Sequence, residues 1–308
     1  RVSLTEDPWF EIDPCRQLVK IANTYQKQIP HNIHYLTKKK EIKRANDKYK
    51  LFESEYFVVA NHNFSTDTSA DAFFDGKMLK SDVYIESIIP IRSYTGKGGV
   101  YIKDGDIRYW QLLLNTPPKV IFFELSDFSS YNALIFEKWL RDHHLSNIIV
   151  VLVWKYYGDS QNIIISASTE LGYLFSKGFG TGIMLKTNLD LKSELQLAFS
   201  ILQGCRLRST KTEYIACPSC GRTLFNLQEV TQKIKEKTDH LPGVKIAVMG
   251  CIVNGIGEMA DADFGYVGAG KEKIDLFVGR KCVQRGIHYS KAVDSLINLI
   301  KEQGMWID

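Results

Sequence analysis

Three cysteines and one glutamate in the last third of the chain have the residue types and spacing of a metal site. The segment CPSCGR places Cys217 and Cys220 on either side of a short turn, and Cys251 ends an apolar run farther along the chain. Asn254 and Glu258 follow in a glycine-rich segment that a buried strand does not require. Thiolates bind soft metals and metal clusters, so this region predicts metal or redox chemistry.

The residue types alone leave three kinds of site open. A structural zinc site needs four ligands, usually in two pairs, and Cys282 is the remaining candidate for a fourth thiolate. An iron–sulfur cluster is compatible with three thiolates, because one iron then accepts another ligand, and Glu258 can supply a weak, displaceable carboxylate oxygen. A thiol–disulfide site is the third alternative, although it leaves Cys251 without a role. Arg222, beside the CxxC turn, is a candidate to pair with a diphosphate or with cluster sulfur, or to form a structural salt bridge.

Two regular patterns are expected to position these residues. Apolar strands alternate with helices between residues 119 and 205, which predicts a parallel α/β layer, open or closed into a barrel. Its strands are expected at 119–125, 147–154, 162–167 and 181–185, and its helices at 131–144, 168–178 and 191–205. From about residue 210 a second, small α/β domain is expected, with a helix at 226–237, strands at 244–251 and 274–279, a glycine-rich loop between those strands, and a helix at 290–304 with Cys282 near its start.

Composition limits the class of protein. With 308 residues, 44% of them hydrophobic, the chain is long enough for about two domains, and a helix at 8–27 and a strand at 56–60 precede the regular part. The net charge of +4, from 39 basic and 35 acidic residues, does not imply a nucleic-acid surface, despite a basic run at 38–44. No apolar run approaches the roughly 20 residues of a membrane helix. Six cysteines are too few for a disulfide scaffold and favour a reducing compartment.

Several segments resemble a known family. TKTEYIACPSCGRTLFNLQEV, HLPGVKIAVMGCIVNGIGEMADADFGYVG, KIDLFVG and the closing LIKEQGMWID resemble the C-terminal domain of 4-hydroxy-3-methylbut-2-enyl diphosphate synthase. The resemblance implies a 4Fe-4S oxidoreductase of the methylerythritol phosphate route to isoprenoids, which reductively opens 2-C-methyl-D-erythritol 2,4-cyclodiphosphate. It also implies ferredoxin or flavodoxin as electron donor. The richness of residues 16–203 in Asn, Lys, Ile and Tyr suits a plastid location (apicoplast or chloroplast stroma), with the bacterial cytoplasm as the alternative.

Carried over position by position, the resemblance assigns roles to five residues. The cluster ligands fall on Cys217, Cys220, Cys251 and Glu258, and Asn254 matches a loop asparagine close to the substrate in the family. One position departs from the family pattern, because the usual Asn-Gly-Pro-Gly has Ile256 in place of proline. Loss of the fixed proline φ is expected to alter the dynamics of this segment without abolishing ligation.

The resemblance also predicts how the chain is divided. Residues 1–15 are similar to the close of the family's N-terminal barrel, and residues 204–308 are expected to form the iron–sulfur domain. Residues 16–203 resemble the inserted, degenerate barrel-like α/β domain of the plant and chlamydial type of the enzyme. Without the substrate-binding barrel the chain is expected to hold a cluster but not to turn over, and any homodimer would form through that missing barrel.

Overall fold

The computed structural model describes residues 9–28, 54–61, 69–126, 130–217 and 221–307, except for the side chains of residues 26–28 and 254. The chain divides into two compact units, one of residues Gln17–Arg208 and one of Ser209–Asp308 together with the N-terminal end up to Arg16. Helix α1 (Trp9–Gln28) carries the chain into the first of these units, where its Tyr25 hydroxyl hydrogen-bonds to Ser130 at 2.7 Å. The assignment of domains to functions stays a prediction.

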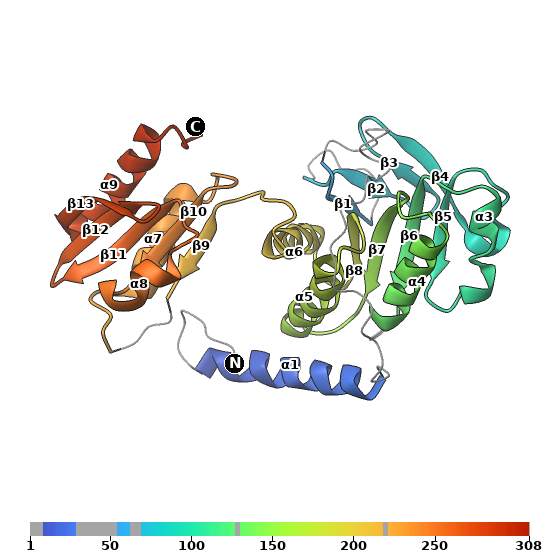
Figure 1. Cartoon of the computed structure of the whole chain (residues 1–308), viewed down its shortest axis with the longest axis horizontal. Helices are drawn as coiled ribbons and strands as arrows, with labels where there is room; N and C mark the ends of the chain where they lie inside the picture. The colour runs from blue at the N-terminus through green and yellow to red at the C-terminus, as the bar shows by residue number, and fades with distance from the viewer. Residues whose placement is uncertain (1–8, 29–53, 62–68, 127–129, 218–220, 308) are drawn as a thin grey trace. The chain divides into compact units, whose positions relative to one another are not determined.

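The unit of residues 17–208 is a closed barrel of eight strands (Figure 1). Strand β1 pairs in parallel with both β2 and β8, and β4 to β8 pair in parallel in chain order, whereas β3 is antiparallel to both of its neighbours. The strands are β1 (Phe57–Ala60), β2 (Ala72–Phe74), β3 (Met78–Lys80), β4 (Ile85–Pro90), β5 (Gly99–Lys103), β6 (Val120–Leu125), β7 (Ile149–Lys155) and β8 (Gly182–Lys186). The expected α/β class is confirmed, and the sheet closes.

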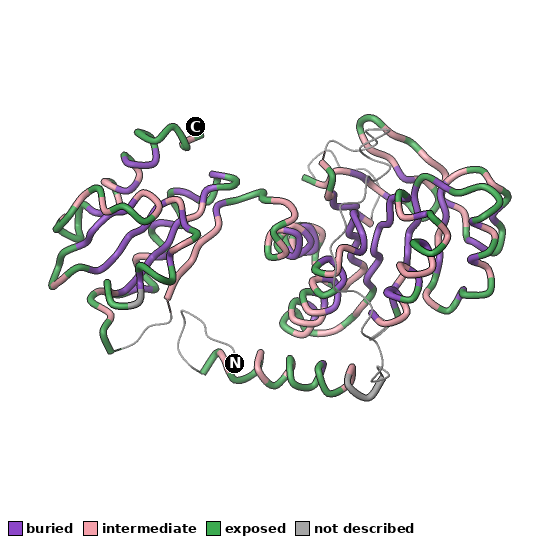
Figure 2. The backbone as a smooth tube through the Cα atoms, in the orientation of Figure 1, coloured by how far each residue is buried: buried purple, intermediate pink, exposed green. Residues whose placement is uncertain are grey.

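Side chains alternate between the barrel interior and a covering layer of helices. Interior positions such as Phe122, Val151 and Met184 form one cluster, while outward positions such as Phe123 pack with Phe136 and Leu171 of the helices in another. Figure 2 accordingly shows buried strands inside a partly exposed helical layer. The helices are α3 (Leu112–Asn115), α4 (Ser130–Asp142), α5 (Ser160–Ser176) and α6 (Leu191–Gly204), with short 3-10 turns η1 (Ile91–Ser93) and η2 (Ile107–Tyr109).

The strand expected at 162–167 is wrong, because these residues belong to helix α5. Asp159 begins the helix by accepting a hydrogen bond from the Asn162 amide at 2.9 Å. Ile163, Ala167 and Leu171 are fully buried at intervals of four residues, which is helical spacing, whereas the neighbouring Ile164 is exposed. The run of isoleucines at 163–165 suggested a strand, but the buried residues of this segment lie on one face of a helix.

The unit of residues 209–308 is a five-stranded sheet in the order β13-β12-β11-β10-β9. The strands β9 (Glu213–Ala216), β10 (Lys245–Met249) and β11 (Phe264–Gly270) are parallel, and β12 (Lys273–Val278) and β13 (Lys281–His288) continue the sheet in antiparallel pairs. Helices α7 (Leu227–Thr238) and α9 (Tyr289–Glu302) contribute to one buried cluster. A second cluster, around Met249 and Met259, lies beside the short helix α8 (Ile252–Glu258).

Two further expectations for this unit are wrong. The glycine-rich segment after Cys251 is not a loop but α8, and Gly255 allows that helix to approach β10, since a Cβ there would lie 2.9 Å from Met249 Cβ. Cys282 is not at the start of the last helix but within β13. Of the other sequence features, the basic run at 38–44 and Cys220 lie outside the described residues.

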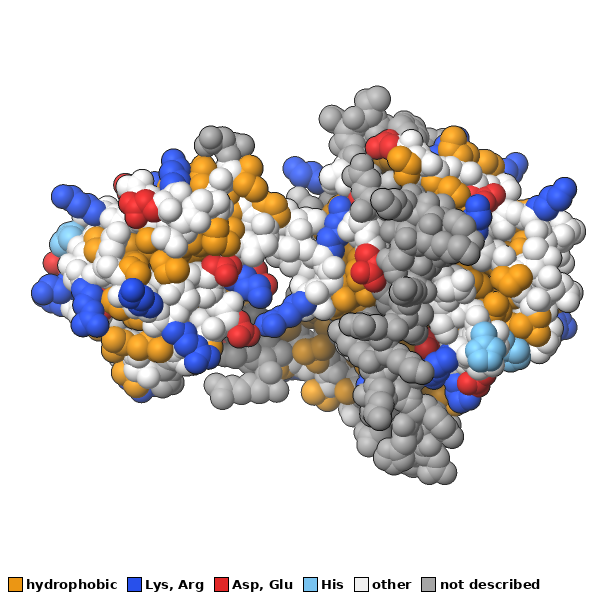
Figure 3. All heavy atoms as spheres, turned by 45° about the horizontal axis from the view of Figure 1, so that its top comes forward, with side chains coloured by type: hydrophobic (Ala, Val, Ile, Leu, Met, Phe, Trp, Pro, Cys, Tyr) orange, Lys and Arg blue, Asp and Glu red, His pale blue; other side chains and the backbone are white. Residues whose placement is uncertain are grey.

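The surface carries mixed charge. Figure 3 shows lysine and arginine side chains scattered over the visible face of both units, with acidic, uncharged and hydrophobic side chains between them. Among the helices of the described residues, none has the length and apolar character needed to cross a membrane.

Candidate metal centre

Cys217 and Cys251 lie at the carboxyl ends of two adjacent strands. Cys217 directly follows β9 and Cys251 comes just after β10, and the two strands are parallel with Ala216 opposite Val248. Parallel neighbours lie about 4.8 Å apart and deliver the residues that follow them to one edge of the sheet. The fold therefore brings two thiols that are far apart in sequence to the same edge.

Gly250, between β10 and Cys251, organises this edge. Its amide donates a hydrogen bond to Cys217 Sγ at 3.2 Å, and its carbonyl accepts one from the Leu224 amide at 3.1 Å. A Cβ on Gly250 would lie 2.8 Å from Thr223 Cγ2, and a Cβ on Gly268 would lie 2.4 Å from the Gly250 carbonyl oxygen. Backbone and side chains thus close tightly around Gly250 and fix the amide that points at the Cys217 sulfur.

Both thiols are suited to hold a soft metal centre. They are half-buried and neither is in a disulfide. Cys251 occupies the N-cap position of α8 in an extended conformation, but its side chain makes no capping hydrogen bond. Amide hydrogen bonds to ligand sulfur, such as that from Gly250 to Cys217, are among the features that tune iron–sulfur clusters. The donors that the structure describes therefore fit a thiolate-bound cluster.

Glu258 is the last residue of α8, and its side chain is exposed. The helix spans seven residues. At about 1.5 Å per residue, it separates Glu258 from Cys251 by about 10 Å along its axis. Among the described residues no three His, Cys, Asp or Glu side chains gather as a metal-binding group, so the structure does not bring Glu258 together with Cys217 and Cys251.

The remaining predicted site residues are Cys220, Asn254 and Arg222. Cys220 and the side chain of Asn254 lie outside the described residues, so their roles stay predictions. Arg222 is exposed, and no described residue forms an ion pair with it. The alternative of a structural salt bridge therefore finds no support among the described residues.

The zinc alternative, with Cys282 as fourth ligand, conflicts with the sheet order. Cys282 stands in one row of paired residues with Phe277, Gly265, Ala247 and Ile215, which spans all five strands. Four strand spacings of about 4.8 Å separate Cys282 from the β9 edge by about 19 Å. The sulfurs of a tetrahedral zinc site lie within about 4 Å of one another, because each Zn–S bond is about 2.3 Å. Cys282 Sγ instead lies 3.6 Å from its own strand's Gln284 carbonyl.

Two contributors to this edge were missed from the sequence. Gly268 and Thr223 contact Gly250 closely, yet neither has a chemical signature, and their roles appear only once β11 and the segment after the CxxC turn are placed beside β10. The motif VMGCIVNG carried no sign that its first glycine donates to a cysteine 33 positions earlier.

The fold and the site together define an α/β protein in which a closed barrel is followed by a small mixed-sheet domain with thiols at its parallel strand ends. Comparison with known proteins identifies the family that this domain matches. Residues 213–302 match the family profile described as GcpE protein C-terminal domain, and this part of the chain belongs to that family.

The whole chain also has relatives. It is 36% identical over 377 aligned residues to the 4-hydroxy-3-methylbut-2-en-1-yl diphosphate synthase (flavodoxin) of Protochlamydia amoebophila, which covers 100% of this chain and 58% of the relative. The flavodoxin enzyme of Chlamydia muridarum is 35% identical over 99% of this chain and 55% of its own length. The chloroplastic ferredoxin enzyme of Arabidopsis thaliana is 58% identical over 147 residues, 47% of this chain and 20% of its own. The resemblance is confirmed, and the chain spans little more than half the length of the two relatives that match it throughout.

Proposed function

We propose that this chain is the barrel insert and cluster-binding part of a 4-hydroxy-3-methylbut-2-en-1-yl diphosphate synthase. The observation that carries the proposal is the meeting of Cys217 and Cys251 at the ends of β9 and β10, inside the region that matches the GcpE C-terminal domain. The names of the full-length relatives give the activity. Because those relatives are longer, the activity belongs to the complete enzyme.

The proposed cofactor is a 4Fe-4S cluster held by Cys217, Cys220, Cys251 and Glu258. When bound, such a cluster supplies one-electron transfer and a Lewis-acidic iron. Cys217 and Cys251 would provide fixed thiolates, and the Gly250 amide would continue to donate to Cys217. Glu258 is exposed and α8 separates it from Cys251, so we infer that the end of α8 unwinds when the carboxylate binds.

The proposed substrate is 2-C-methyl-D-erythritol 2,4-cyclodiphosphate. Its reductive opening takes up two electrons and two protons, breaks a C–O bond at each of two carbons, and releases one oxygen as water. Arg222 follows the CxxC motif with its side chain exposed, where its guanidinium would pair with a diphosphate oxygen, and Asn254 would orient the substrate from α8. Glu258 would hold the cluster only weakly, because a hard carboxylate oxygen is a poor ligand for a soft, thiolate-bound iron.

The electron donor and the cellular compartment are proposed from the names of the relatives. Their names specify flavodoxin in the two chlamydial-type relatives and ferredoxin in the plant enzyme, so one of these carriers would deliver the electrons. The plant relative is chloroplastic, which supports a plastid as the compartment, with the bacterial cytoplasm as the alternative. A role in isoprenoid precursor synthesis follows from the product, and a homodimer would form through the substrate-binding barrel of the complete enzyme.

A matched pair of cysteine variants tests the cluster. We expect the chain, reconstituted without oxygen, to bind about four iron and four sulfide and to absorb broadly near 400 nm. Cys251→Ala should lose most of this iron, because it removes one of the strand-end thiolates. Cys282→Ala should retain it, because Cys282 lies at the opposite edge of the sheet. Equal iron loss in both variants, or one zinc that depends on Cys282, would refute the proposal.

A further inference from the structure

The barrel of residues 17–208 carries a group of charged side chains at one mouth. Strands β5, β7 and β8 each end in a lysine, which are Lys103, Lys155 and Lys186, and β6 carries Glu124 one residue before its end. Each of these residues follows an interior residue by two positions, as Lys186 follows Met184 and Glu124 follows Phe122. Since side chains alternate along a strand, all four project from the inner face at the carboxyl-terminal mouth.

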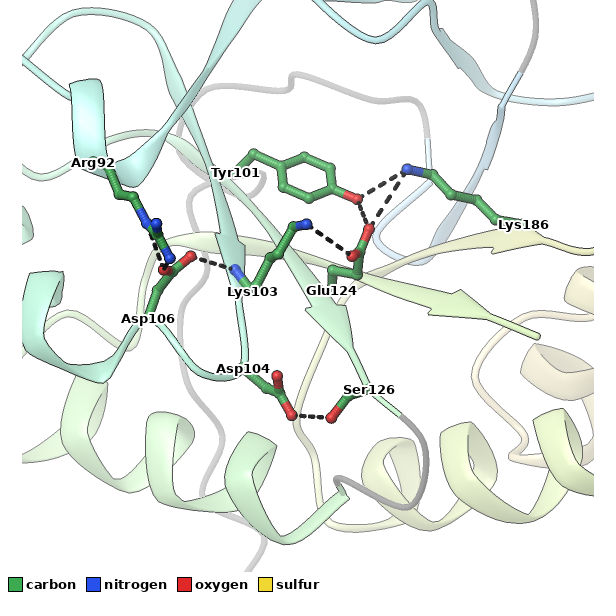
Figure 4. Close-up of polar contacts among 8 residues, drawn as sticks. All are labelled: Arg92, Tyr101, Lys103, Asp104, Asp106, Glu124, Ser126 and Lys186. Atoms are coloured by element: carbon green, nitrogen blue, oxygen red, sulfur yellow. Dashed lines mark hydrogen bonds and ion pairs between the residues drawn. The ribbon is translucent and has the colours of Figure 1, made fainter.

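Tyr101 and Glu124 form the centre of this group (Figure 4). The Tyr101 hydroxyl donates a hydrogen bond to Glu124, and Lys186 Nζ donates one to the Tyr101 oxygen at 2.9 Å. Lys186 Nζ is also 3.8 Å from Glu124 Oε2, and Lys103 Nζ is 3.9 Å from Glu124 Oε1. Lys186 and Glu124 each keep 19% of their side-chain surface exposed, whereas Lys103 keeps 67%. Lys186 and Glu124 are therefore sheltered from solvent, whereas Lys103 lies at the exposed rim of the group.

Positive charge exceeds negative charge within the group. Among the described residues of the group, two ammonium groups, Lys103 and Lys186, pair with the Glu124 carboxylate, and the third, Lys155, lies over the Tyr157 ring at 5.7 Å. Burial, together with repulsion from Lys155 and Lys103, lowers the pKa of Lys186 despite the attraction of Glu124. The nearby acids on the β5 turn are directed elsewhere, because Asp106 pairs with Arg92 at 2.9 Å and Asp104 accepts a hydrogen bond from Ser126 (Figure 4). An anion at the mouth would offset this surplus.

The loops that follow β7 and β8 are held in place. Asn188, after β8, receives a hydrogen bond from the Gly158 amide at 2.9 Å and donates one to the Gly158 carbonyl at 2.9 Å, which joins the loop after β8 to the loop after β7. The buried Glu194 accepts hydrogen bonds from the amide and hydroxyl of Thr187 at 2.6 and 2.7 Å. Fixed loops reduce the entropy lost when a ligand is bound.

We propose that the carboxyl-terminal mouth of this barrel binds a small anion of the phosphate class through Lys186, Lys155 and Lys103. A phosphate group carries up to two negative charges, which matches the surplus of two ammonium groups, and lysine ammonium groups bind phosphate as compact point charges. In closed α/β barrels ligand sites lie at this mouth, and phosphate sites often lie at the loops after the seventh and eighth strands. The inference concerns the barrel alone and does not depend on the proposed cluster.

Calorimetric titration of the whole chain with inorganic phosphate, at low ionic strength in a phosphate-free buffer, tests this site. We expect saturable binding at one site per chain, and affinity reduced about tenfold or more in Lys186→Met, because a charge-assisted hydrogen bond is lost. Lys155→Gln serves as a second variant with an exposed side chain, so that a folding defect in Lys186→Met leaves the test intact. Lys177→Gln is the control, since Lys177 precedes β8 at the opposite mouth and contacts Tyr173.

The outcomes distinguish a binding site from a structural ion-pair network. Loss of affinity in both mouth variants, with Lys177→Gln unchanged, supports the site, and tighter binding of pyrophosphate would indicate a diphosphate as its ligand. No saturable binding of either anion, or equal losses in the control, would overturn it.

Discussion

Gly268 provides a direct test of how the strand-end thiols are positioned. A methyl group at Gly268 would meet the Gly250 carbonyl oxygen at 2.4 Å and the Phe225 ring at 3.2 Å, so the chain at Gly250 must move by several tenths of an ångström. Overpacking of this kind costs about 1–3 kcal/mol. A weakened Gly250–Cys217 hydrogen bond adds about 0.5–1.5 kcal/mol. The lower entropy of the unfolded alanine chain offsets about 0.4–1 kcal/mol. The net expectation for Gly268→Ala is a loss of about 2 kcal/mol.

Hydrogen exchange of the whole chain measures this loss locally. A loss of about 2 kcal/mol should speed amide exchange in β10 about 30-fold. Gly270→Ala is the matched control, because Gly270 lies in the same strand and nothing surrounds its Cβ position within 4 Å. The control shares the unfolded-state gain, so its β10 exchange should stay unchanged or slow slightly. Unchanged exchange in Gly268→Ala, or equal acceleration in both variants, would refute the tight packing at Gly250.

Three further predictions follow from other parts of the structure. Ile256→Pro should unwind the end of α8, because proline removes an interior amide and clashes with the preceding turn, and exchange should accelerate within residues 252–258 but not in β10. Arg208→Ala should destabilise the barrel by about 2 kcal/mol in denaturant titration, because the Asp71 carboxylate loses its ion pair with Arg208 Nη1 at 2.5 Å. The control Lys138→Ala, which breaks an exposed ion pair, should cost less than about 0.5 kcal/mol. Burial and the neighbouring lysines lower the pKa of Lys186 below 10.5, so the unfolded chain binds more protons between the lowered value and 10.5. Barrel stability should therefore rise with pH in that window, and Lys186→Met should remove the rise.

The parts of the fold that the sequence predicted are those with strong local patterns. The strands β6 and β7 and the helix α6 before Cys205 were predictable because their apolar runs are long and bounded by polar turns. The strand expected at 162–167 failed because Ile163, Ala167 and Leu171 form one buried helical face, which a short apolar run does not reveal. The antiparallel strand that contains Cys282 was missed because its alternate residues are half-exposed and its register shifts twice.

The candidate site was predictable as residue types but not as geometry. The CxxC turn and Cys251 were found from spacing, yet their meeting depends on the parallel pairing of β9 with β10, which no local pattern specifies. Helix α8 was hidden by Gly255 and Gly257, because glycine is the expected residue of loops. Gly255 instead permits close packing of the helix against Met249. The lysines at the barrel mouth did have a sequence pattern, since the strands GVYIK, IVVLVWK and GIMLK each end in lysine. This pattern indicates a shared site only once the sheet is known to close into a barrel.

Iron and acid-labile sulfide content, with the visible spectrum, of the anaerobically reconstituted chain beside Glu258→Ala tests the central claim most directly. Glu302→Ala is the control, as an exposed carboxylate in the last helix. The proposed ligation predicts about four iron and broad absorption near 400 nm in the wild-type chain and in the control. It also predicts a cluster that is lost readily from Glu258→Ala. One tightly held zinc, or a cluster equally stable in all three proteins, would contradict ligation by three cysteines and Glu258.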